Sequence, residues 1–147
     1  MPIYINRVIE KLHKYKGKDD PFGQVKIMED KRTEQIEALQ TLAEYNQKVL
    51  KNIPILVREL KGERLDDTDK FLTAIVNAIN WEVEVLNATL DVINEKEEKV
   101  SKEKVNDKIL ALSDALKSQN ENAQAEAFEQ LVPELEVIEK AINEVIA

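Results

Sequence analysis

Apolar side chains recur every three to four positions along most of this chain, the spacing of one face of an α-helix. The clearest pattern occupies residues 25–61, where core positions repeat every seven residues on two neighbouring lines: Ile36, Ala43, Leu50, Val57; and Leu39, Asn46, Ile53, Leu60. This pattern predicts a long bundle helix that begins at Val25 or Asp30 and ends at Lys61. Pro54 predicts a kink inside it, and Gly62 predicts its end.

Asn46 interrupts this apolar line. A buried Asn can fix the register of packed helices at some cost in stability. The alternative is that its side chain points to water at the edge of the stripe.

A second long helix is predicted from about Asp66 to Glu97, because the oxygens of Asp66-Asp67-Thr68-Asp69 can cap free amides. Its apolar positions form two stripes: Leu72, Ile75, Ile79, Val83, Leu86, Leu90, Ile93; and Ala74, Ala78, Trp81, Val85, Ala88, Val92. So wide an apolar arc touches neighbours on two sides. This helix is therefore either the central helix of the bundle or one that also contacts another chain.

The C-terminal third carries two further helical patterns. Ser101 is the expected cap of the first, and the apolar positions are Val105, Ile109, Leu112, Leu116; and Phe128, Leu131, Leu135, Ile138, Ile142, Val145. On one unbroken helix these stripes would be rotated by about 80°. The rotation favours a break near Gln119, with Ser118-x-x-Glu121 as a capping box, and leaves a continuous bent helix over 102–146 as the alternative. Pro133 predicts a kink or a late helix start.

The first residues have a different character. Residues 1–18 predict an amphipathic helix whose basic stripe comprises Arg7, Lys11, Lys14 and Lys18. Residues 19–24 predict a loop, because they contain Pro21 and Gly23. The whole chain, 1–147, is therefore expected to be one all-α domain: an antiparallel up-and-down bundle of four or five helices with long central helices, whose main body is 25–147.

The net charge of −8 is unevenly distributed along the chain. Up to Lys61 there are 12 Lys and Arg against 9 Asp and Glu, and from Gly62 onward there are 9 Lys and Arg against 20 Asp and Glu. Either the basic first helix lies near the acidic C-terminal helices, or the acidic face binds a basic partner. Acidic surfaces repel phosphate, so no nucleic-acid partner is expected. No signal peptide or membrane span is recognisable. We therefore expect a cytoplasmic location.

Candidate chemistry is sparse. Glu10 and His13 have a Glu-x-x-His spacing used in di-iron bundles, but His13 is the only histidine and the chain has no cysteine. Neighbouring carboxylates such as Glu82 and Glu84 point to different sides of a helix, and we expect them to be solvated or ion-paired. We therefore assign no catalytic, cofactor or metal residue and expect no enzyme activity.

These observations favour a non-enzymatic helical protein–protein interaction module, whose partner is another protein or a second copy of the chain. The candidate partner-binding face comprises Trp81, Val85, Asn77, Asn80, Glu84, Asn87 and Phe22, because aromatic anchors flanked by polar groups are typical of contact sites. Trp81 and Phe22 alternatively fill space in the bundle.

Two other function classes remain open. One is a small acidic cytosolic chaperone of the kind that escorts export substrates such as flagellar proteins, since such chaperones are often all-helical, acidic and about this long. The other is an enzyme or ligand carrier with a pocket between helices, for which only Asn46 and Thr89 are convergent polar candidates. Of these two classes, the enzyme or ligand carrier is the less expected, so we do not expect a small-molecule partner.

Overall fold

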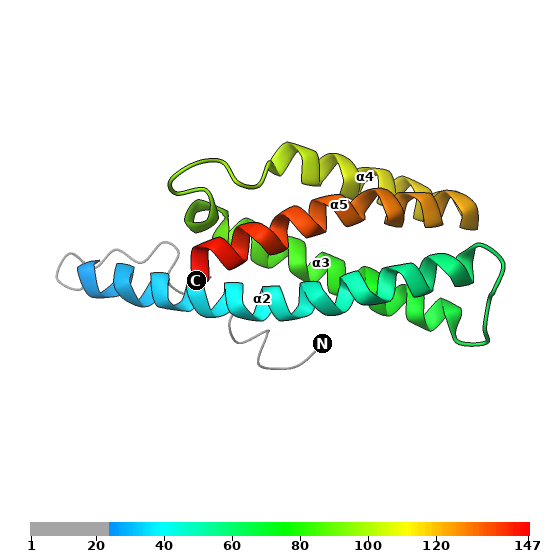
Figure 1. Cartoon of the computed structure of the whole chain (residues 1–147), viewed down its shortest axis with the longest axis horizontal. Helices are drawn as coiled ribbons and strands as arrows, with labels where there is room; N and C mark the ends of the chain where they lie inside the picture. Colours follow the sequence, from blue (N-terminus) through cyan, green and yellow to red (C-terminus); the bar gives the residue numbers. More distant parts are fainter. Residues whose placement is uncertain (1–23) are drawn as a thin grey trace.

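The computed structural model describes residues 24–147, with side chains from residue 31 onward. This part contains four helices and no strand, and the helices are α2 (Gln24–Leu60), α3 (Thr68–Ile93), α4 (Lys102–Ser118) and α5 (Glu121–Ile146). Consecutive helices run in opposite directions along one long axis (Figure 1). The predicted all-α, antiparallel bundle with long helices is confirmed. The predicted helix 1–18 and residues Glu10, His13 and Phe22 lie outside the described residues.

Helix α2 is the central element. It lies between α3 and α5 and packs extensively against both, whereas α4 packs mainly on α5 (Figure 1). The line through Leu39, Asn46, Ile53 and Leu60 is buried along its whole length, and Leu42 and Leu56 beside it are almost completely buried as well. Fully burying one such aliphatic side chain contributes about 1.5–3 kcal/mol. On the other predicted line Ile36 and Leu50 are half-buried. None of the described helices has both the length and the apolar character needed to cross a membrane.

The ends of the helices differ in part from expectation. Helix α2 begins at Gln24, which was assigned to the loop, and the chain turns after Leu60 through Gly62, whose φ of +132° disfavours residues with a Cβ atom. Pro54 and Pro133 both lie inside continuous helices. A late helix start at Pro133 is therefore wrong, because α5 already begins at Glu121.

The predicted start of α3 within Asp66–Asp69 is confirmed, since the helix begins at Thr68, but the capping differs from expectation. The Asp67 side chain makes no capping hydrogen bond. Instead the Thr68 hydroxyl accepts from the Leu65 backbone amide at 2.8 Å and donates to the Glu59 carboxylate of α2 at 2.7 Å. At its other end α3 stops at Ile93 rather than Glu97, because the Asn94 side chain hydrogen-bonds to the connecting loop.

The predicted break between the last two helices is confirmed. Gln119 adopts the left-handed conformation, with φ of 59°, and separates α4 from α5. The expected capping box is wrong, since the Asn120 side chain caps α5 by accepting from the Ala123 amide at 3.0 Å. Ser101 caps α4 as predicted.

The difference between core and surface positions can be tested with two leucines. Leu131 of α5 is completely buried, whereas Leu110 of α4 is 62% exposed. We expect Leu131→Ala to lower the free energy of unfolding by about 2–5 kcal/mol and Leu110→Ala to change it by less than about 0.5 kcal/mol. Urea denaturation followed by circular dichroism measures both, and similar losses would contradict this placement of α5.

Candidate functional site

The residues of the candidate partner-binding face occupy different environments. Asn77, Asn80, Glu84 and Asn87 form an exposed strip along α3. Trp81 is only 2% exposed and Val85 is fully buried, so both belong to the core and are out of reach of a partner in this conformation.

Trp81 packs between helices of the same chain. Its ring centroid lies 5.0 Å from that of Tyr45 of α2, with the rings tilted by 53°, an arrangement that stabilises aromatic pairs. In this structure Trp81 therefore fills space inside the bundle, which is the alternative to a role in partner binding.

Glu82 of α3 is the most unusual side chain of the bundle. It is 3% exposed, and neither carboxyl oxygen has a hydrogen-bond partner within residues 24–147. The expectation that Glu82 is solvated or ion-paired is wrong. Its position explains this, because Glu82 lies three residues after Ile79 and four before Leu86, on the first apolar stripe.

The surroundings of Glu82 are apolar and come from all four helices. The carboxyl group adjoins a cavity lined by Leu42, Ile79, Val83, Leu86, Val105, Ile109, Leu131, Leu135 and Ile138. The volume of this cavity is about 10 Å³, close to the smallest space that holds one water molecule. There is no room in it for an organic ligand.

A second buried polar group joins α2 to α5. The Asn46 amide nitrogen donates to the Leu135 carbonyl and to the Glu139 carboxylate, both at 2.8 Å. Gln47 donates to the other Glu139 oxygen at 2.9 Å. Asn46 is completely buried, so the alternative in which it points to water is wrong.

The electrostatics of Glu82 follow from these surroundings. Burial and, to a smaller extent, the negative charge of Glu139 together raise its pKa from 4.5 to about 8. Removing a carboxylate from water disfavours its charged form, and a like charge nearby adds to the effect. Glu82 is therefore mostly protonated at pH 7. Across the part of the chain that the structure describes, no group of three or more His, Cys, Asp or Glu side chains is placed to bind a metal.

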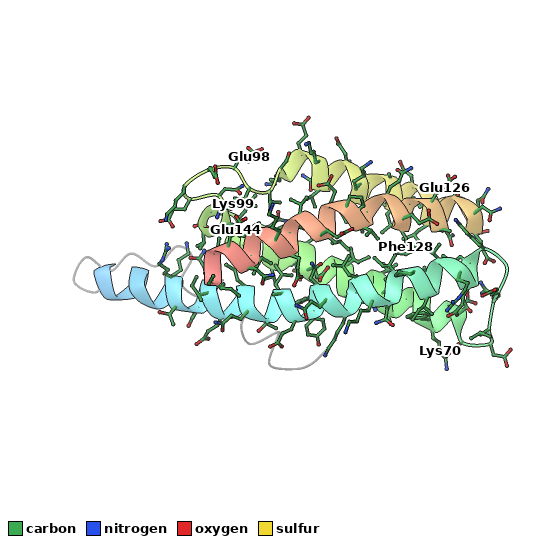
Figure 2. The ribbon with its side chains drawn as sticks, viewed as in Figure 1. Lys70, Glu98, Lys99, Glu126, Phe128 and Glu144 are labelled. Carbon is green, nitrogen blue, oxygen red and sulfur yellow. The ribbon has the colours of Figure 1, made fainter. Side chains whose placement is uncertain are left out.

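On the outer surface, an open groove of about 650 Å³ runs between α2 and the C-terminal half of α5. It is lined by Leu50, Glu136, Glu139, Lys140, Asn143, Glu144 and Ala147. Near one end, Glu144 forms an ion pair with Lys99 at 3.3 Å (Figure 2). Glu139 therefore belongs both to this groove and to the buried hydrogen bonds with α2.

A family model described as a domain of unknown function, DUF8042, matches residues 37–141. The chain belongs to this family. The part of the DUF8042 domain that matches includes Asn46, Glu82 and Glu139. No curated protein and no solved structure matches the chain.

The sequence of the DUF8042 domain contains a signal for the inward-facing positions of Glu82, which is buried, and Glu139, which is half-buried. Like Glu82, Glu139 occupies an apolar stripe, four residues after Leu135 and three before Ile142. Helical phase therefore indicates that both carboxylates face inward. The opposite expectation for Glu82 came from its residue type, because charged side chains are seldom fully buried.

The protonation of Glu82 predicts how the stability of the DUF8042 domain depends on pH. The unfolded chain loses this proton near pH 4.5 and the folded chain near pH 8. The free energy of unfolding therefore falls as pH rises between these values, by about 1.4 kcal/mol per pH unit from this group. We expect Glu82→Gln to remove this loss, so that its stability relative to the unsubstituted protein rises by roughly 3 kcal/mol between pH 5 and pH 7.

Urea denaturation of both proteins at pH 5, 6, 7 and 8 measures this difference. Glu84→Gln is the matched control, because Glu84 is exposed two residues away on the same helix. Its stability should follow that of the unsubstituted protein at every pH. Parallel pH profiles for Glu82→Gln and the unsubstituted protein would show that the Glu82 carboxyl is not held protonated.

Proposed function

We propose that this domain is a non-enzymatic protein-interaction module whose groove between α2 and α5 binds a basic segment of a partner protein. The observation that carries the proposal is the groove itself, which is open, about 650 Å³ in volume and bordered by Glu136, Glu139 and Glu144. Because the groove is open rather than enclosed, it suits a few side chains of a peptide or helix better than a small molecule, which pockets usually surround.

The charge of α5 supports a basic partner. The ionisable residues of this helix are Glu121, Glu126, Glu129, Glu134, Glu136, Glu139, Glu144 and Lys140. Glu121, Glu129 and Glu144 form ion pairs with Arg64, Lys61 and Lys99. The other four carboxylates outnumber Lys140 and give the helix a negative potential. Such a potential accelerates the approach of a cationic segment and favours it over an acidic one.

One apolar side chain in the groove adds a second requirement. Leu50 of α2 lines the groove and is only half-buried. Covering it would remove further apolar surface from water. The fitting partner is therefore an amphipathic segment that carries Lys or Arg beside an aliphatic side chain.

A synthetic amphipathic helix of Lys and Leu, about four turns long, is a suitable probe for the groove, and a Glu/Leu peptide of the same length is its counterpart. We expect the full-length protein to bind the basic peptide and not the acidic one, with an affinity that falls as salt is added. Glu136→Lys should weaken binding about fivefold or more, because it places a positive charge inside the groove. Fluorescence anisotropy of the labelled peptide measures the dissociation constant.

Glu84→Lys provides the matched control. It makes the same change in net charge on the exposed strip of α3, away from the groove. If only Glu84→Lys weakened peptide binding, the binding surface would be the strip of Asn77, Asn80 and Asn87 instead of the groove. Equal weakening by both variants would indicate attraction to the overall charge only, and binding of both peptides would refute a charge-selective groove.

A further inference from the structure

Helix α4 is attached to the bundle by few buried side chains. Only Val105 and Leu112 are fully buried in it, whereas α5 buries nine residues. Its packing is mainly against one neighbour, α5, and Leu110 is largely exposed to solvent. Elements with few buried apolar contacts open first in folded proteins. Among the described helices, α4 is therefore the one that can separate from the bundle at the lowest free energy.

The same helix shields the buried carboxyl of α3 from solvent. Val105 and Ile109 of α4 form one wall of the small cavity that Glu82 adjoins. The other walls come from α2, α3 and α5. Separation of α4 removes this wall and gives water access to the Glu82 carboxyl.

We infer that the protonation of Glu82 controls the packing of α4: the helix stays on the bundle while the carboxyl is neutral and separates when the carboxyl ionises. The physical basis is linkage, since only the open form lets the carboxylate be hydrated, and a proton that binds the closed form more tightly stabilises it. This inference is independent of the proposed groove function.

The groups that face Glu82 support this direction of control. On α5, the negative charge of Glu139 disfavours ionisation of Glu82 in the closed form. The side chains that α2 and α4 contribute to the cavity are apolar: Leu42, Val105 and Ile109. Among residues 31–147, the two causes of the shift are burial and the charge of Glu139, and both raise the pKa. The closed form therefore holds the pKa at about 8, and opening releases it toward 4.5.

Hydrogen exchange of the full-length protein at pH 6, 7, 8 and 9, read by mass spectrometry, tests this inference. After correction for the intrinsic effect of pH on exchange, protection of the α4 amides should fall by up to about tenfold per pH unit between pH 6 and pH 8 and then level off. Amides of α2 and α5 exchange only when the whole domain unfolds, so they should be more strongly protected than those of α4 at every pH. In Glu82→Gln, protection of α4 should not depend on pH and should exceed that of the unsubstituted protein at pH 8.

Glu84→Gln is again the control and should behave as the unsubstituted protein does. If Glu82→Gln does not fold, Glu82→Met replaces it, because Met is uncharged and similar in volume. Three results would overturn the inference: protection of α4 that is independent of pH in the unsubstituted protein, protection of α4 equal to that of α2 and α5, which would mean that α4 opens only with the whole domain, or a pH-dependent loss of α4 protection that persists without the Glu82 carboxyl.

Discussion

The apolar face of α2 is the constraint on which the rest of the bundle depends. Its buried side chains must be covered along most of a 37-residue helix, and no single neighbour is wide enough to do this. Helices α3 and α5 therefore flank α2 on two sides, and the short turn at Gly62 makes α3 antiparallel to it. Helix α4 is added to this three-helix unit through α5, which explains why it buries so little of its own surface.

The polar groups inside this apolar frame differ in how well they are satisfied. Burying a polar group is tolerated when it is hydrogen-bonded. The amide nitrogen of Asn46 meets this condition through Leu135 and Glu139, whereas its carbonyl oxygen has no partner among the described residues. Glu82 lacks such partners among the described residues, and it remains in the core by keeping its proton. Residues that depart from the apolar pattern of a core usually lie at functional or strained sites. Glu82 is the clearest such position in this bundle.

The helices could be predicted from sequence because each is encoded by a repeating pattern, and the break at Gln119 followed from the rotation between two stripes. The caps at Asp67 and Ser118 could not, because they depend on which side chain reaches a free amide once the turn has formed. The sequence likewise could not decide whether Trp81 lies in the core or at an interface. An apolar stripe shows that a face is covered, but not whether Tyr45 of the same chain or another molecule covers it.

Glu139 connects the groove with the buried carboxyl of Glu82. It lines the groove, accepts hydrogen bonds from Asn46 and Gln47, and raises the pKa of Glu82 through its charge. A cationic side chain bound beside Glu139 offsets that charge and thereby makes ionisation of Glu82 easier. Coupling between two sites is reciprocal, so ionised Glu82 in turn strengthens the binding of a cation in the groove. Because the drive for α4 to separate comes from the difference between the pKa of Glu82 in the closed and open forms, a bound cation that lowers the closed-form pKa would reduce that drive.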